Sequence, residues 1–182
     1  MRKVHIITLA RLNRAMTKVA GELNRHGLWD DRLRAVPVVL VPFAGCYGWQ
    51  HYGGSGEICI PRLSLSKLHD FLTGGYVSLS DVLRHEYAHA LADTHRGLMR
   101  SRHFTDAFGR SHEFNECSEF DPKVHISRYA ATNSSEDFAE NFMHYLKSRG
   151  TLPPKHSTYV IRRKWQFIHA LCQAIQDGKT RW

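Results

Sequence analysis

The sequence SLSDVLRHEYAHALADTHRG, from Ser78 to Gly97, says most about the fold. Ser78 and Asp81 form a capping-box pattern, so we expect a helix to begin near residue 79 and run to about Thr94. Within it, two histidines stand four residues apart and a glutamate follows the first. Side chains at i and i+4 lie on one face of a helix, so both imidazole rings can bind one metal ion.

These residues are His85, Glu86 and His89, and they form an H-E-x-x-H motif. Two neutral imidazoles, one carboxylate and one water complete a tetrahedral catalytic zinc site. The motif therefore predicts one Zn2+ ion on His85 and His89. Glu86 would lie beside the metal-bound water and act as the general base.

The third protein ligand is expected from Glu136, in the segment YAATNSSEDFAENF that begins at Tyr129. Ser134 with Asp137 is a second capping-box pattern, and it predicts a helix on which Glu136 and Glu140 share one face. Carboxylates among apolar side chains are costly unless a cation or a hydrogen-bond donor compensates them. We expect Glu136 to bind zinc and Glu140 to orient a ligand histidine.

Two alternatives concern this third position. His95 follows His89 at the spacing of the metzincin motif, but Ala92 stands where that motif has a glycine. If the helix continues, six residues rotate His95 away from the metal. In the alternative interpretation of Glu136, its carboxylate has only a structural role: it lies in the first turn of the helix, where the helix dipole favours an acidic side chain.

These motifs carry a family resemblance. H-E-x-x-H followed by a helical E-x-x-x-E resembles the gluzincin clan of zinc metallopeptidases. The segment from Tyr129 is similar to a stretch of the anthrax lethal factor catalytic domain and its relatives, including the Pro-Pro endopeptidases. The likeness extends to a Pro-Lys turn before a Phe-Ile helix, here Pro154-Lys155 and Phe167-Ile168, and covers roughly residues 45–175.

The resemblance implies a zinc metalloendopeptidase. It implies the ligand set His85, His89 and Glu136, with Glu86 as the general base, and it implies that Tyr129 donates a hydrogen bond to the oxyanion. The toxin's recognition and delivery domains have no counterpart here, so its delivery and its substrate specificity are not implied.

The remaining pattern predicts an α+β fold. We expect one zincin-like metallopeptidase domain over residues 1–182, with a small twisted sheet, an active-site helix and C-terminal helices. Because proline cannot donate to a ladder, the predicted strand Glu57–Pro61 is expected at a sheet edge. An extended peptide or protein substrate would add to this strand, with Ile58, Cys59 and Ile60 as substrate-binding residues.

The composition of the chain restricts its expected partners and location. The 182 residues carry a formal charge of +8, which favours acidic partners. No apolar run approaches the roughly 18 residues of a membrane span, and no signal-peptide pattern is present. We therefore expect no membrane partner and a cytoplasmic location by default. Export by a signal-independent route stays open, and so does the oligomeric state.

Two other functions stay open. A DNA-associated zinc protease of the SprT type would take a third histidine, His103 or His112, from the polar segment Arg96–Arg128. A non-enzymatic nucleic-acid-binding domain is suggested by runs such as Arg162-Arg163-Lys164. Nucleic acid is not the favoured partner, because no nucleic-acid-binding motif accompanies these charges.

Overall fold

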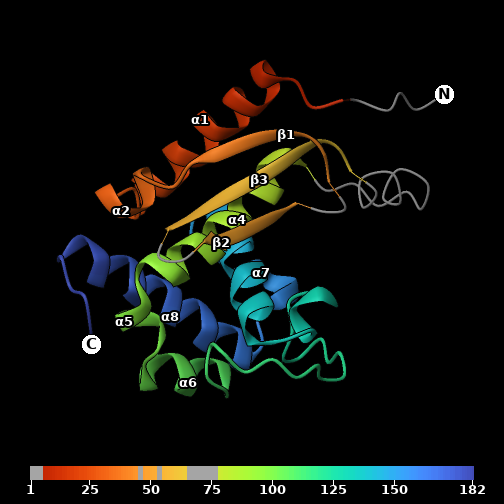
Figure 1. Ribbon diagram of the computed structural model, residues 1–182. Helices are drawn as coiled ribbons and strands as arrows, with labels where there is room; N and C mark the ends of the chain where they lie inside the picture. The colour runs from red at the N-terminus through yellow and green to blue at the C-terminus, as the bar shows by residue number, and fades with distance from the viewer. Residues whose placement is uncertain (1–5, 45–46, 53–54, 65–77) are drawn as a thin grey trace.

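The structure, a computed structural model, describes residues 6–44, 47–52, 55–64 and 78–182. Helices and a small sheet combine in an α+β arrangement, as predicted, with the sheet in the upper part of Figure 1 and helices α5 to α8 below it. The strands are β1 (Val38–Ala44), β2 (Gly48–Tyr52) and β3 (Ser55–Ser64). The helices are α1 (Leu9–Arg25), α2 (Asp31–Arg34), α4 (Leu79–Thr94), α5 (Arg96–Met99), α6 (Arg102–Phe108), α7 (Ser134–Lys147) and α8 (Tyr159–Gln176), with short 3-10 turns at Tyr129–Ala131 and Pro154–His156.

The three described strands are ordered β1-β3-β2, with β1 parallel and β2 antiparallel to β3. The strand predicted at Glu57–Pro61 is therefore central, and the prediction of an edge strand there is wrong. Pro61 lies opposite Val41 of β1 and beyond the last β2 pair, at Cys59. A residue without an N–H is tolerated where one side of the strand has no such partner.

This correction removes the basis for placing substrate on β3. Ile58 and Ile60 have no exposed surface, and Cys59 is 6% exposed. Since β3 pairs with a strand on each side at Ile58 and Cys59, an incoming peptide has no free edge there. Both β2 and β3 contact α4, the predicted zinc-binding helix. Of these two strands, only β2 lies at an edge of the described sheet.

Helix α4 is confirmed with its predicted cap: the Ser78 hydroxyl accepts a hydrogen bond from the Asp81 N–H. It packs against α1, α7, β2 and β3, which explains why most of its residues are buried. Helix α7 begins one residue earlier than its predicted cap implied, because Asn133 accepts from the Glu136 N–H and is the N-cap. The axes of α4 and α7 lie side by side and bring the two motifs together.

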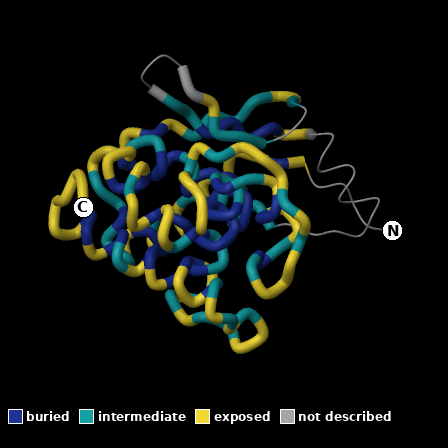
Figure 2. The backbone as a smooth tube through the Cα atoms, turned by 90° about the horizontal axis from the view of Figure 1, so that it is seen from below, coloured by how far each residue is buried: buried dark blue, intermediate teal, exposed yellow. Residues whose placement is uncertain are grey.

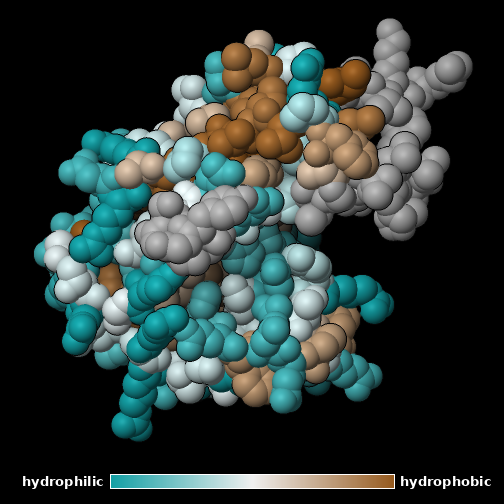
Figure 3. Space-filling model, viewed as in Figure 1, coloured by the Kyte–Doolittle hydropathy of each residue, from teal (hydrophilic) through white to brown (hydrophobic). Residues whose placement is uncertain are grey.

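The polar segment after α4 folds into α5, α6 and a long connection to α7. Phe104 and Phe108 of α6 pack into the core with Phe138 and Phe167, as the sequence predicted for one or two helical turns. In Figure 2 the buried stretches run through the middle of the molecule, and exposed loops surround them. Hydrophobic side chains also gather at the surface over β1 and β3 in Figure 3, where Phe43 and Leu63 are exposed.

No helix among the described residues is both long and apolar enough to cross a membrane.

Candidate metal centre

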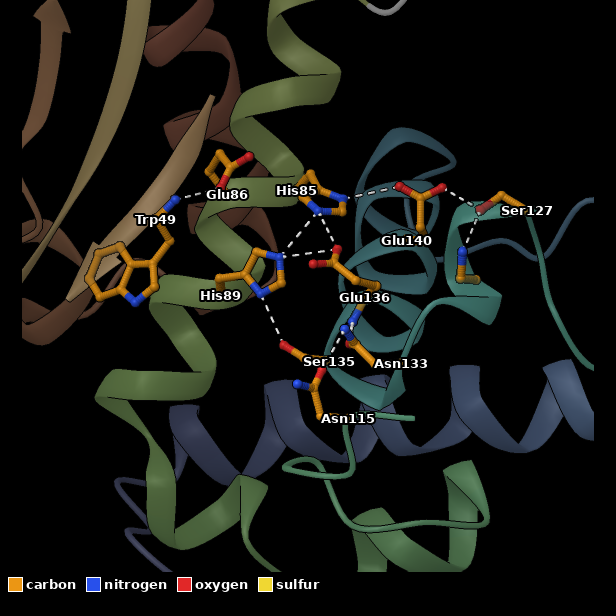
Figure 4. A network of polar contacts seen from close by, with 11 residues as sticks. Trp49, His85, Glu86, His89, Asn115, Ser127, Asn133, Ser135, Glu136 and Glu140 are labelled. Carbon is orange, nitrogen blue, oxygen red and sulfur yellow. Dashed lines mark hydrogen bonds and ion pairs between the residues drawn. The ribbon is translucent and has the colours of Figure 1, made fainter. Parts of the chain in front are cut away.

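Helices α4 and α7 place His85, His89 and Glu136 together (Figure 4). The Nε2 atom of His85 lies 2.9 Å from Oε2 of Glu136 and 3.2 Å from Nε2 of His89. The His89 Nε2 atom lies 3.4 Å from the same carboxylate oxygen. Three ligand atoms from residues far apart in the sequence therefore meet at one point, as the motifs predicted.

These spacings fit a tetrahedral zinc ion. Bonds of about 2.0–2.1 Å to nitrogen and oxygen place the ligand atoms of a tetrahedron about 3.3–3.4 Å apart. The three separations are 2.9, 3.2 and 3.4 Å, and the two longer ones are close to this spacing. Two imidazole nitrogens and one carboxylate oxygen are also the donor set of a catalytic zinc site, which keeps its fourth position for water or substrate. The residues present therefore fit this metal.

Neighbouring side chains orient the ligands. Glu140 lies 3.0 Å from Nδ1 of His85 and accepts a hydrogen bond of 2.6 Å from the hydroxyl of Ser127. Nδ1 of His89 lies 3.1 Å from the Ser135 hydroxyl. When the second ring nitrogen is held in this way, the tautomer and the ring orientation of a metal-binding histidine are fixed. Glu140 occupies the orienting position that the sequence predicted.

The carboxylates shift the protonation of the cluster. Burial lowers the pKa of His85, but hydrogen bonds with Glu136 and Glu140 outweigh it and raise this pKa to about 10. Burial raises the pKa of Glu136, but hydrogen bonds from His85 and His89 bring it down to about 2. The carboxylates of Glu136 and Glu140 thus favour a positive charge at the point where the three candidate ligand atoms meet.

Glu86 lies beside this point and is 7% exposed. Its Oε2 atom accepts a hydrogen bond of 2.8 Å from the backbone N–H of Trp49 in β2 (Figure 4). Burial raises the pKa of Glu86, and the positive charge of His85 and His89 and the Trp49 N–H partly offset this rise. A raised pKa suits a carboxylate that accepts and returns a proton near neutral pH.

Trp49 was not identified as a positioning residue from the sequence. The contact is made by a backbone N–H, which every residue except proline carries. The only signal in the sequence is the glycine-rich stretch around Trp49. At Gly56 an added Cβ would lie 2.0 Å from the Trp49 ring, so the indole needs a glycine at that position.

Tyr129 lies on the turn before α7, 54% exposed, with its ring centroid 5.7 Å from that of His85. It lines a cavity of about 530 Å³ that also contains the three ligand residues and Glu86. Tyr47, Trp49 and Phe114 are the other aromatic walls, and no Lys or Arg is among the described residues around the cavity. The excess positive charge carried by the described part of the chain therefore does not line this cavity.

The other histidines considered from the sequence lie outside the ligand set. His95 is buried with Nε2 3.1 Å from Asp30, and the His103 ring packs on Trp182. His112 lines the cavity, but its Nε2 atom is buried without a hydrogen-bond partner and its ring contacts Phe104 and Phe138. Among the described residues, the one group able to hold a metal is His85, His89 and Glu136.

No protein-family model, curated protein or solved structure matches this chain.

Proposed function

We propose that this protein is a zinc-dependent metalloendopeptidase of the gluzincin type. One observation carries the proposal: three ligand atoms, from His85, His89 and Glu136, stand at tetrahedral zinc spacing and face a cavity that also contains a buried glutamate. A purely structural cluster of histidine and glutamate needs neither the cavity nor Glu86 beside it.

Each residue of the site has its own role in the proposed reaction. When bound, zinc supplies a Lewis acid that polarises the substrate carbonyl and acidifies water. Glu86 takes the proton from the attacking water and passes it to the leaving amine. Tyr129 donates a hydrogen bond to the oxygen on which negative charge develops. Glu140 and Ser135 hold the histidine rings, and the Trp49 N–H holds the Glu86 carboxylate.

The geometry favours Glu136 over a third histidine as the remaining ligand. Neither His103 nor His112 belongs to the ligand group, although His112 borders the cavity. The nucleic-acid alternative gains no support from the cavity, because none of its described walls is a Lys or an Arg.

The test combines metal analysis with peptide cleavage. We expect the wild-type protein to bind one zinc ion and to cleave members of a random peptide library. Glu86→Gln should keep the zinc and lose about 100- to 10,000-fold in kcat, the usual contribution of a general base. Glu136→Ala should lose both zinc and activity.

Two results would contradict the proposal. Full zinc content and activity in Glu136→Ala would remove the gluzincin ligand set. Loss of zinc in His112→Ala, with zinc retained in Glu136→Ala, would transfer the third ligand to His112 and favour the repair-protease alternative.

A further inference from the structure

A second cavity, of about 730 Å³, lies between α1, the start of α4 and the end of α7. Among the described residues, it shares no wall with the cavity at the candidate metal centre. Its walls carry five cationic side chains and two carboxylates, an excess of three positive charges: Lys18, Arg25, Arg84, Lys147, Arg149, Glu22 and Asp81. Part of the positive charge of the chain is therefore concentrated at this one cavity.

Both carboxylates already have partners within the protein. The buried Arg84 guanidinium donates hydrogen bonds of 2.7 Å to each oxygen of Glu22, and it also binds one oxygen of Asp81. The other Asp81 oxygen accepts hydrogen bonds from the Ser78 hydroxyl at 2.8 Å and from Lys147 at 3.0 Å. Because each carboxylate oxygen has a donor, neither residue requires a cation from solvent.

Three of the cations, in contrast, have no anionic partner. Lys18, Arg25 and Arg149 are exposed, and their side chains form no ion pair or hydrogen bond within residues 6–44, 47–52, 55–64 and 78–182. Arg25 lies in the last turn of α1, where a cation offsets the helix dipole. Lys18 lies in the middle of α1 and has no such role. The cavity therefore presents positive charge that an anionic ligand can neutralise.

The backbone of Arg149 supports a functional role for its side chain. Arg149 has a φ of 53° and is the one non-glycine residue with positive φ in the part of the chain that the structure describes. A helix commonly ends with glycine in this left-handed conformation, because a Cβ is strained there. An arginine at this position thus costs stability while it places a guanidinium at the cavity. Such strain is typical of functional sites.

The size and the chemistry of the cavity define the class of ligand. Cavities of about 300–1,000 Å³ hold whole small molecules. Lysine and arginine are the side chains that bind phosphate groups, arginine with two parallel hydrogen bonds. Two adjacent phosphate groups carry about three negative charges near neutral pH, which matches the charge excess of the walls. None of the described walls is aromatic, so none stacks on a base, and recognition rests on the phosphate groups.

We propose that this cavity binds a small molecule with a diphosphate or triphosphate group, which is held by Lys18, Arg25 and Arg149. The site is separate from the candidate metal centre, so the inference goes beyond the proposed peptidase function and does not depend on it. Arg14 lies one helical turn before Lys18 and outside the cavity. A ligand confined to the cavity does not need Arg14, whereas an extended polyanion such as nucleic acid would also contact it.

Isothermal titration calorimetry with tripolyphosphate, using zinc-loaded protein, tests the proposal. Tripolyphosphate should bind at a single site, at least about tenfold more tightly than orthophosphate or sulfate. Lys18→Ala and Arg149→Gly should each weaken binding by about tenfold, the scale of one hydrogen bond to a charged group. Arg14→Ala removes an equal charge from the same helix and should have little effect. Because tripolyphosphate also chelates zinc, Glu136→Ala should be titrated as well and should give the wild-type Kd.

Arg149→Gly also separates binding from folding. Glycine adopts a positive φ without strain, so this variant should unfold at a temperature equal to or above that of the wild type while it loses affinity for tripolyphosphate. A merely structural role of Arg149 would instead lower the unfolding temperature. Circular dichroism during heating provides this measurement.

Each contrary result has a distinct meaning. Absence of tripolyphosphate binding, or an unchanged Kd in Lys18→Ala and Arg149→Gly, would overturn the inference. Equal weakening by Arg14→Ala, with tighter binding of a DNA duplex, would replace the small molecule with an extended polyanion. Loss of binding in Glu136→Ala would place the anion at the metal centre. None of these results bears on the proposed function, which zinc analysis and peptide cleavage test separately.

Discussion

The backbone N–H of Trp49 donates a 2.8 Å hydrogen bond to Oε2 of Glu86, and this bond joins the edge strand β2 to α4, the helix that carries two of the candidate metal ligands. The bond fixes one oxygen of a carboxylate that also lines the cavity. A base held in this way needs little reorganisation before it accepts a proton. The position of β2 is therefore as important for Glu86 as the helix on which Glu86 lies.

Gly56→Ala should lower kcat by about 10- to 100-fold, the scale of effect expected for a displaced catalytic group. The new Cβ would lie 2.0 Å from the Trp49 ring, so the indole must move, and we expect β2 to shift with it and to weaken the hydrogen bond from the Trp49 N–H to Glu86. Steady-state kinetics on a cleaved library peptide provide the measurement. Gly48→Ala is the control, because nothing lies within 4 Å of a Cβ there. Equal effects of the two substitutions would argue against the role of Trp49.

Glu140→Ala should weaken zinc binding by about 10- to 100-fold, because removing the partner of a ligand histidine typically costs that much. It deletes the acceptor 3.0 Å from Nδ1 of His85 and leaves all three ligands in place. Competition with a chromogenic chelator measures the Kd. Ser127→Ala removes only the hydroxyl that donates to Glu140 and should have a smaller effect. If Glu140→Ala binds zinc as the wild type does, packing alone orients His85.

Tyr129→Phe should reduce kcat by roughly 100-fold at unchanged zinc content, as for loss of one donor to an oxyanion. The hydroxyl is not in the ligand set, and the ring contact with His85 is kept in phenylalanine. Tyr47→Phe removes a different hydroxyl from the same cavity and should change kcat little. An increase in KM with an unchanged kcat would assign Tyr129 to substrate binding instead.

The pH dependence of stability should reveal the buried ring of His112. Burial, followed by the neighbouring charges of His89 and Arg100, lowers the pKa of His112 from 6.5 to about 4 in the folded protein. Between these values the unfolded chain binds more protons, so the free energy of unfolding rises with pH. The protein should thus lose stability as pH falls from 6.5 toward 4.

His112→Phe isolates this contribution, because it removes the titration and keeps an aromatic ring beside Phe104 and Phe138. Urea unfolding at pH 7 and pH 5, with a chelator present in both, should show a smaller loss of stability in the variant. An identical loss in both proteins would mean that His112 titrates normally in the folded state.

A buried ion pair between α7 and α8 should dominate the stability of α7. Lys164 of α8 has no exposed surface and donates 2.6 Å hydrogen bonds to Asp137 and to the Val124 carbonyl. Lys164→Met leaves Asp137 without its cation and should lower the free energy of unfolding by about 3–5 kcal/mol. Urea denaturation measures this. Adding Asp137→Asn should recover part of the loss, and no recovery would point to packing defects instead.

The sequence by itself determined the three candidate ligands and the two helices that carry them. Helical periodicity is local, so the spacing of His85 and His89 places both rings on one face whatever surrounds them. Caps at Ser78 and Asn133 are local as well, although capping-box patterns placed the second helix start one residue late. The ligand geometry followed once α4 and α7 packed together.

Tertiary structure alone decided the strand order and the partner of Glu86. Pro61 suggested an edge, yet β3 is central and β2 is the edge strand beside α4; among the described residues, β2 pairs with β3 only as far as Cys59, so Pro61 lies beyond that pairing. Backbone N–H groups are the same at every residue but proline, so only the register of β2 selects Trp49 as the donor to Glu86. Residue spacing specifies what a single helix presents, whereas contacts between elements depend on the packing of the whole chain.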